Sequence, residues 1–382
     1  MIEKLVVSVS PHIRDRDSTR RIMWTVVATL IPAFIWSGYL FGYRAWLVTA
    51  VSVIFAVASE YVVQAYRKVP ITIGDGSAVI TGMLLAFVLP PNVPLWLPAI
   101  GAIIAIVLVK QVFGGLGHNI WNPALLGRAA LQLSFPDLIN HAQWPILNPK
   151  TMGYGLGRFA GNILDAVPAT VYEKTADAVA VARHLALPQA GDAVSMATPL
   201  TMLPQTGIHS YGYSPASFPM WMGLQPGSLG ETSFILLALG CLVLIALRVV
   251  KWYVPVLYLG SLVLMVTVLP YSKGEEPMRL VTQWGAWGNP LYHVMFGGAA
   301  LGAFFMATDM VTTPLTWKGQ AIFAVGCGML TALFRLYGGY PEGVCYSILL
   351  MNTATPLIDR ITQPRVYGTV WPSGRPTKGT NP

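Results

Sequence analysis

About ten apolar segments, most of them near the length of a membrane span, constrain this chain more than any other feature. A helix needs about 20 apolar residues to cross the hydrocarbon core of a bilayer. Of the 382 residues, 54% are hydrophobic and only 10% are charged, whereas a soluble domain carries about a quarter charged residues. The composition therefore predicts an all-α polytopic membrane protein with about ten transmembrane helices.

The apolar segments fall into two kinds, continuous and interrupted. The continuous ones are Ile22–Leu40, Trp46–Val63, Leu97–Val112, Ser233–Leu247, Val254–Leu269 and Gln320–Leu336. The others are shorter or interrupted by glycine and proline, and they are Ala78–Leu89, Asn122–Phe135, Pro290–Thr308 and Gly343–Ile358. Broken helices at membrane depth are tolerated only where protein covers them or where they line a cavity. We therefore expect the interrupted segments to surround a cavity.

Lysine and arginine residues in the short loops predict the orientation of the spans. They cluster before the first span and after the second, sixth and last spans, as Arg14, Arg16, Arg20, Arg21, Arg67, Lys68, Arg248, Lys251, Arg360 and Arg365. All of them fall on one side if both termini are cytoplasmic. This prediction divides the chain into a membrane region 1–136, an external (periplasmic) region 137–231, and a membrane region with a cytoplasmic tail, 232–382.

The net charge of +8 is explained by these basic residues, which set the orientation of the spans. The basic residues gather at the ends of apolar segments and form no patch with interleaved aromatic residues, so they do not indicate nucleic-acid binding. We expect membrane lipid, and no nucleic acid, around this chain.

Similar segments in the two halves of the chain indicate a duplication. Gly82–Phe87 is similar to Gly302–Ala307, and Val112–Gly115 is similar to Leu336–Gly339. Chance similarity between glycine-rich apolar segments is the alternative. Because five spans per half is an odd number, duplicated halves would be inverted in the membrane. Inverted repeats with interrupted helices are typical of transporters, which bind their ligands near the midplane.

Ionisable residues inside apolar segments are candidates for function, because their transfer into lipid is costly. They are Glu60, Lys110, Arg128, Asp309, Arg335 and Glu342. We expect Lys110 and Arg335 to lie at the interface, where long side chains extend their charged ends into water. Asp309, next to Thr308 and followed by two further threonines, is compatible with ion binding, with hydrogen bonding to a polar ring, or with capping a helix end.

Asn122 precedes Pro123 and is expected to cap the short helix that begins there. The start of a broken helix within the membrane attracts an anion or a carbonyl-rich ligand, and hydrogen bonding between helices is the alternative role. The three cysteines, Cys241, Cys327 and Cys345, lie in apolar segments without metal-ligand spacing, so we expect buried thiols. The sequence contains no hydrolase, P-loop, zinc-protease or haem motif, and it predicts no metal site and no catalytic side chain.

A polar run from Asp192 to Leu200 lies between the two membrane regions. Thr198 followed by Pro199 is typical of a helix start, with threonine as the cap and proline in the first position. A threonine in this setting is also a candidate attachment point for a phosphate-bearing cofactor. The two interpretations are compatible, because a helix start presents free N–H groups to a phosphate.

Four motifs spread along the chain resemble those of one known family. They are Ser10–Arg14 followed by Asp17–Thr19, Gly114–Ala124, Ala307–Asp309, and Asp192–Pro199. Together they resemble the NqrB/RnfD family, and the resemblance covers essentially the whole chain. NqrB, from the sodium-pumping NADH:quinone reductase, carries a longer N-terminal extension, whereas this chain reaches its first span by Ile22. The chain therefore resembles RnfD, a membrane component of the Rnf ion-translocating electron-transport complex, with an NqrB-type subunit as the alternative.

This resemblance implies a fold and two flavins. The fold would be similar to that of urea channels, with two inverted five-helix repeats. FMN would be joined through its phosphate to Thr198, in a motif to which Ser195, Met196 and Ala197 also belong; Met196 departs from the small residue often found at its position. A second, non-covalent flavin, riboflavin, would lie in the helical core, and the candidates for its site or for an ion pathway are Asn122, Thr308 and Asp309.

The resemblance also implies a function and partners. The chain would relay electrons in the bacterial inner membrane, within a complex that passes them between ferredoxin and NAD and couples them to Na⁺ or H⁺ transport. Other subunits of the complex and a flavin transferase would be its partners. A flavin performs the redox step itself and needs no side-chain acid or base. A non-redox channel or transporter for a small polar solute, and a purely structural anchor for other subunits, remain as alternatives.

Overall fold

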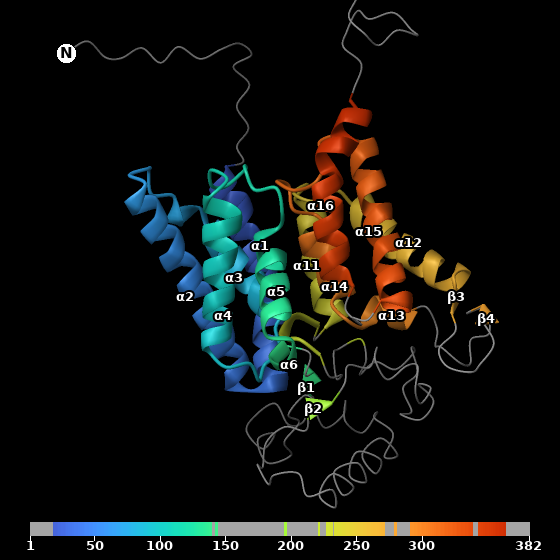
Figure 1. Cartoon of the computed structure of the whole chain (residues 1–382), viewed down its shortest axis with the longest axis horizontal. Coiled ribbons are helices and arrows are strands. Elements are labelled where there is room, and N and C mark those ends of the chain that lie inside the picture. The colour runs from blue at the N-terminus through green and yellow to red at the C-terminus, as the bar shows by residue number, and fades with distance from the viewer. Residues whose placement is uncertain are drawn as a thin grey trace, which may run out of the picture.

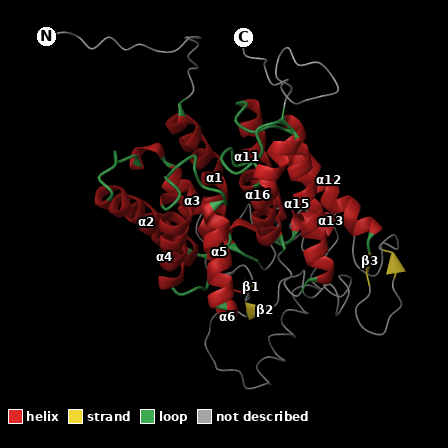
Figure 2. Cartoon of the chain, turned by 45° about the horizontal axis from the view of Figure 1, so that its top comes forward, coloured by secondary structure: helices red, strands yellow, loops and turns green. Residues whose placement is uncertain are grey.

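The computed structural model describes residues 18–139, 142–143, 195–196, 221, 227–231, 233–271, 279–280, 291–338 and 343–363. In this part of the chain, helices lie side by side and form the body of the molecule (Figure 1). Two short antiparallel pairs of strands accompany them, β1 (Ala142–Gln143) with β2 (Ser195–Met196) and β3 (Pro270–Tyr271) with β4 (Arg279–Leu280). Figure 2 shows how little strand there is beside the helices. The predicted all-α membrane class is confirmed.

The first half of the molecule contains five apolar helical segments at the predicted places. They are α1 (Thr19–Phe41), α2 (Tyr43–Tyr66), α3 (Ser77–Phe87), α4 (Trp96–Ile103), which continues into the π-helix η2 (Ile104–Gln111), and α5 (Pro123–Ser134). The short helices η1 (Ile73–Asp75) and α6 (Pro136–Ile139) precede α3 and follow α5. In this half the predicted segments and the observed helices agree to within a few residues.

The second half has a similar order of elements. The short η4 (Leu229–Glu231) is followed by α11 (Phe234–Ala246), α12 (Tyr253–Val268), α13 (Leu291–Met295), α14 (Ala299–Leu301), the π-helix η5 (Gly302–Met306), α15 (Trp317–Tyr337) and α16 (Val344–Ile361). The segment that we expected to run from Pro290 to Thr308 is thus broken once, between α13 and the helix formed by α14 and η5. Gly297 and Gly298, with φ of 69° and 64°, make the break, because glycine adopts left-handed backbone without strain.

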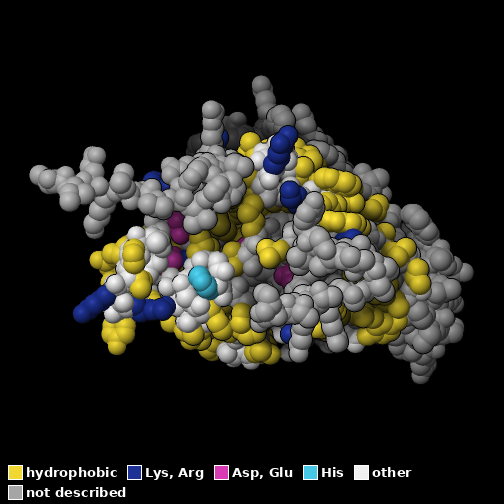
Figure 3. All heavy atoms as spheres, turned by 90° about the horizontal axis from the view of Figure 1, so that it is seen from above, with side chains coloured by type: hydrophobic (Ala, Val, Ile, Leu, Met, Phe, Trp, Pro, Cys, Tyr) yellow, Lys and Arg dark blue, Asp and Glu magenta, His cyan; other side chains and the backbone are white. Residues whose placement is uncertain are grey.

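Three of the described helices, α1, α2 and α15, are long and apolar enough to cross a membrane on their own, and α3, α4 with η2, α11 and α12 are shorter. Many of their apolar side chains point outward; Ile54, Val62 and Leu264, for example, are 62%, 61% and 61% exposed. Figure 3 shows such side chains around the described part of the surface. Exposed apolar side chains on long apolar helices are compatible with contact to lipid.

Contacts between helices define how the halves are built and joined. Within the first half α2 packs against α3 and α4, and within the second half α12 packs against α15. Between the halves, α1 packs against α11 and α5 packs against α16. The start of α1 and the end of α16 lie at one end of the bundle, and α6, β1 and β2 lie at the opposite end (Figure 1).

Glycine allows the closest of these helix contacts. Gly328 on α15 faces α12 where a Cβ would collide with Ser261 Oγ and the carbonyl oxygen of Tyr258. Small residues at helix interfaces let backbones approach each other, which is how helices gain packing energy in a membrane. Gly260, on α12 itself, faces open space, with no atom within 4 Å of an added Cβ.

The contrast between these two glycines gives a stability test. Gly328→Ala should separate α12 from α15 and lower the stability of the protein by about 1–3 kcal/mol, the usual cost of overpacking a close contact. Gly260→Ala should be neutral or slightly stabilising, because it adds a methyl group in open space to the same helix pair. Thermal unfolding of both variants in detergent measures the difference. Equal melting temperatures would show that the α12–α15 contact is looser than described.

Candidate functional site

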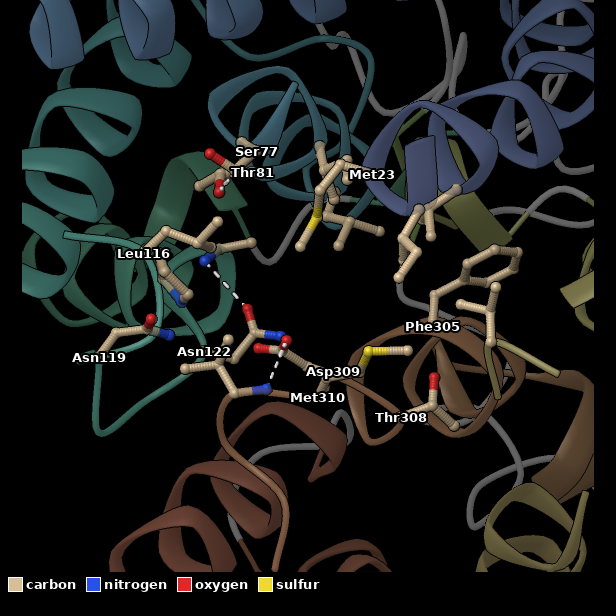
Figure 4. Close-up of a pocket in the computed structure, with 18 of the residues that line it drawn as sticks. Met23, Ser77, Thr81, Leu116, Asn119, Asn122, Phe305, Thr308, Asp309 and Met310 are labelled. Atoms are coloured by element: carbon tan, nitrogen blue, oxygen red, sulfur yellow. Dashed lines mark hydrogen bonds between the residues drawn. The ribbon is translucent and has the colours of Figure 1, made fainter. Parts of the chain in front are cut away.

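The best-formed pocket lies between the two halves, near the end of the bundle at which α1 begins. It has an enclosed volume of about 100 Å³ and opens to the outside. Its lining comes from α1, α3, η2, the segment between η2 and α5, α5, α11 with the residues after it, and η5 with the loop that follows it. The lining includes Met23, Ser77, Ile80, Thr81, Leu84, Lys110, Leu116, Asn119, Asn122, Phe305, Thr308 and Asp309. Figure 4 shows Ser77 and Thr81 on one side of this pocket and Thr308 and Asp309 on the other.

The predicted cap of the fifth helix is confirmed, and it also joins the two halves. Asn122 Oδ1 accepts hydrogen bonds from the N–H groups of Ala124 and Leu125 at 3.1 and 3.4 Å. Asn122 Nδ2 donates to the carbonyl oxygen of Met306 at 3.4 Å. Capping and interhelical hydrogen bonding, which were alternatives for this residue, therefore occur together. Asn122 is 3% exposed and holds the start of α5 against the end of η5.

Asp309 caps the turn that follows η5. Its Oδ1 accepts a hydrogen bond from the N–H of Val311 at 3.2 Å, and its Oδ2 accepts one from the hydroxyl of Thr312 at 3.3 Å. Thr308 donates its hydroxyl to the carbonyl oxygen of Phe304 at 2.8 Å. The carboxylate thus has a structural role and still faces the pocket. Asn122, Thr308 and Asp309, which the sequence analysis grouped as candidates for a second flavin or an ion pathway, line the same pocket.

Two π-helices also lead to this pocket, and the sequence did not predict them. In η5 the N–H of Ala307 donates to the carbonyl oxygen of Gly302 at 2.7 Å. At the end of η2 the N–H of Val112 donates to the carbonyl oxygen of Val107 at 3.1 Å. Such wide turns are rare and occur frequently at functional sites. Here η5 precedes Asp309 and η2 contains Lys110, so each half brings an irregular helix to the pocket.

A buried ion pair lies behind the pocket wall formed by the first half. Lys110 Nζ lies 2.7 Å from Glu60 Oε1, and the two side chains are 2% and 1% exposed. Lys110 also donates to the hydroxyl of Ser77 at 2.5 Å, and Gln111 Nε2 donates to Glu60 Oε1 at 2.9 Å. The prediction that Lys110 extends to the interface was wrong, because α2 supplies a carboxylate that compensates its charge inside the protein.

The same prediction was wrong for Arg335, for a different reason. Arg335 is 9% exposed, and its guanidinium donates to the carbonyl oxygens of His293, Phe296 and Gly297, the latter two at 2.8 and 2.7 Å. These carbonyls lie where the chain breaks between α13 and α14. Irregular backbone at membrane depth needs such partners, so the guanidinium replaces the hydrogen bonds that a continuous helix would make.

The predicted flavin motif falls largely outside the described residues. Ser195 and Met196 form β2, in which Ser195 pairs with Gln143 and Met196 with Ala142, whereas Ala197 and Thr198 lie outside the described part, as does Glu342. Their roles stay predictions. Cys241, Cys327 and Cys345 are free and buried, as expected for apolar segments, and Arg128 is buried within α5.

Comparison with known proteins supplies the family. The sequence pattern of the NQR2, RnfD, RnfE family matches residues 6–368. The chain belongs to this family. Within the family, the RnfD subunit of the proton-translocating ferredoxin:NAD⁺ oxidoreductase complex of Clostridium ljungdahlii is 42% identical over 368 residues, which are 95% of this chain and 96% of that protein.

Further relatives agree with this assignment. The RnfD subunit of the Na⁺-translocating ferredoxin:NAD⁺ oxidoreductase complex of Acetobacterium woodii is 41% identical, over 95% of both chains. The corresponding subunit of an ion-translocating oxidoreductase complex of Stutzerimonas stutzeri is 37% identical, over 92% of this chain and 93% of that one. The resemblance to RnfD within the NQR2, RnfD, RnfE family is therefore confirmed.

The buried ion pair predicts a non-additive pair of variants. Lys110→Met should leave the Glu60 carboxylate buried without its counter-charge and lower stability by about 3–5 kcal/mol. The double variant Lys110→Met with Glu60→Gln should recover most of this loss, because glutamine keeps the Oε1 acceptor for Gln111 and carries no charge. Thermal unfolding in detergent compares the two variants. If Lys110→Met were as stable as the unmodified protein, this result would contradict a buried, charged pair of Lys110 and Glu60.

Proposed function

We propose that the chain is the flavin-carrying RnfD subunit of an ion-translocating ferredoxin:NAD oxidoreductase complex, in which it relays electrons and couples them to Na⁺ or H⁺ transport. The observation that carries the proposal is the pocket between the halves, where Asn122, Thr308 and Asp309 meet in a chain related to such subunits over 95% of its length. Its partners are then the other subunits of the complex, a flavin transferase and membrane lipid.

The pocket has the chemical character that a flavin needs. A flavin has an apolar dimethylbenzene end and a pyrimidine end rich in hydrogen-bonding groups. Ile80, Leu84 and Phe305 offer apolar walls, whereas Asn122 and Asp309 offer polar atoms. We assign the non-covalent riboflavin to this pocket. When bound, the flavin supplies the electron-accepting ring; the protein supplies position and electrostatics.

The covalent FMN belongs to the region 137–231. In the proposal its phosphate is esterified to Thr198, and Ser195 and Ala197 form part of the surrounding motif. The short pairing of β1 with β2 supports this assignment in one respect only: it gives Ser195 and Met196, just before the threonine, an extended backbone next to residues that follow α6.

For the fold we propose ten spans in two inverted five-helix repeats, similar to urea channels, with 1–136 and 232–382 as the membrane regions. The contacts between the halves support this proposal. The first helices of the two halves, α1 and α11, pack against each other, and so do the last helices, α5 and α16. Contacts between equivalent elements are what a two-fold axis between the repeats requires.

For the orientation we propose a bacterial inner membrane with both termini on the cytoplasmic side and region 137–231 in the periplasm. The start of α1 and the end of α16 lie at the same end of the bundle, opposite α6, β1 and β2 (Figure 1), which supports this topology. The pocket would then open near the cytoplasmic side, and Thr198 would lie on the periplasmic side.

The covalent flavin is tested at Thr198. Mass spectrometry of the Thr198 peptide, after co-expression with a flavin transferase, should show an added FMN. Thr198→Val should abolish flavin fluorescence that survives denaturation, whereas Thr201→Val, which removes a nearby hydroxyl, should retain it. An unmodified Thr198 peptide in a chain that conducts a solute in liposomes would favour the non-redox channel. Unchanged electron flow through a complex with Thr198→Val would favour a purely structural subunit.

The non-covalent flavin is tested by filling the pocket. The Thr198→Val chain should still release riboflavin on denaturation, and adding Ile80→Trp should reduce the amount at least fivefold, because Ile80 lines the pocket. Ile103→Trp serves as the matched control, since Ile103 is 39% exposed on the outside of α4. The flavin released per chain is measured by fluorescence. Equal flavin in the two tryptophan variants would contradict the assignment to this pocket.

A further inference from the structure

Hydrogen bonds join three helix ends of the second half, at the end of the bundle where α1 begins. The hydroxyl of Tyr253, in the first turn of α12, donates to Gln320 Oε1, in the first turn of α15. The hydroxyl of Thr316, which caps α15, donates to that of Thr362, just after α16, at 2.7 Å. The start of α12, the start of α15 and the end of α16 are thereby fixed next to one another.

Each of these three helix ends carries an exposed cation. Lys251 precedes α12, Lys318 lies in the first turn of α15, and Arg360 lies in the last turn of α16. Among the described residues, none of the three has an ion-pair partner. The carboxylate beside them, Asp359, is half-buried and accepts a hydrogen bond from the N–H of Leu315 at 3.0 Å. The three ends therefore share a surplus of positive charge that is open to a ligand.

Large apolar side chains lie among these cations. Trp252 and Trp317 are 63% and 67% exposed, and Leu315 and Ile361 are exposed as well. The ammonium of Lys318 lies 5.7 Å from the centre of the Trp317 ring. Figure 3, which views this end of the bundle, shows basic side chains next to apolar ones. Tryptophan is enriched at the level of the lipid headgroups, so this mixture favours a lipid over an acidic protein surface in water.

The hydrogen bonds also bring the two tryptophans to adjoining helices. Trp252 packs edge-on against Tyr253, with ring centres 6.1 Å apart, and Tyr253 bonds to Gln320. Trp317 precedes Gln320 by three residues, which is about one turn of α15. The two indoles and the cations of the same helix ends therefore belong to one surface.

We propose that the starts of α12 and α15 and the end of α16 form a binding site for the headgroup of an anionic phospholipid, in the leaflet at this end of the bundle. Lys251, Lys318 and Arg360 donate to the lipid phosphate, because charge-assisted hydrogen bonds to phosphate are strong. Trp252 and Trp317 set the depth of the lipid. A phosphatidylcholine headgroup brings its own cation, which the three cations repel, so the site prefers a headgroup with net negative charge. The site requires neither flavin.

The experiment counts the lipids that stay with the protein. The full-length chain is reconstituted in nanodiscs of phosphatidylcholine with a minor share of phosphatidylglycerol, transferred to mild detergent, and examined by native mass spectrometry. The unmodified chain should retain phosphatidylglycerol in excess over its share of the nanodisc. Lys251→Gln with Lys318→Gln should lower this enrichment about fivefold or more, since each cation near an anionic surface contributes about that factor. Lys251→Arg with Lys318→Arg should keep it.

A matched pair of cations separates this site from the total charge. Arg20 and Lys68 are exposed cations in the first half, at the start of α1 and after α2, and Arg20→Gln with Lys68→Gln should leave the enrichment unchanged. An equal loss in the two glutamine variants would overturn the inference, as would an unmodified chain without enrichment. If Lys251→Gln with Lys318→Gln kept the enrichment but no longer co-purified with other subunits of the complex, the surface would be a protein contact and the lipid site would be refuted.

Discussion

Interrupted helices inside a membrane have to satisfy their backbone polar groups without water, and the rest of this structure depends on how they do so. Asn122 satisfies two N–H groups at the start of α5 and binds the carbonyl of Met306 at the end of η5. Arg335 satisfies carbonyls at the break between α13 and α14. Each unsatisfied group would cost several kcal/mol in hydrocarbon. Because these side chains meet that need, the breaks can exist, and the pocket lies beside the one that Asn122 holds.

The proposed topology would separate the two proposed flavins across the membrane. The pocket is lined by the first turns of α1, the start of α3 and the residues that follow α11, all at the end of the bundle opposite α6, β1 and β2 (Figure 1). Thr198 follows β2 in the chain by two residues. An electron that passes between the two flavins would therefore cross much of the membrane, and the chain itself would hold both ends of that path.

Much of the fold could be predicted from the sequence, because apolar length and glycine or proline breaks fix where helices lie. Asn122 could also be recognised, since Asn followed by Pro is a local capping signal. The buried positions of Lys110 and Arg335 could not be predicted, because each depends on partners far away in the sequence: Glu60 lies on α2, and the carbonyls that Arg335 binds lie before α14. Burial of a charge is decided by tertiary contacts that no local pattern contains. The π-turns were missed for a similar reason, since tertiary packing selects them.

Each half places a cation shortly before its glycine pair, and the two cations are used differently. Lys110 and Arg335 both lie in the last turns of the helix that precedes a glycine pair, and both reach back to the start of a short helix, α3 or the α14 segment. The Arg335 guanidinium donates its hydrogen bonds to backbone carbonyls, so its charge is distributed over neutral acceptors. Lys110 instead faces a carboxylate and a hydroxyl and lines the pocket. On the proposed repeat Arg335 corresponds to Gln111, so the two cations are neighbouring positions and not copies of one residue: one holds a break together, and the other is paired with a carboxylate beside the pocket. Arginine suits the break, because its fork of N–H donors can reach several carbonyls at once, whereas the compact ammonium of lysine suits a single carboxylate and a hydroxyl.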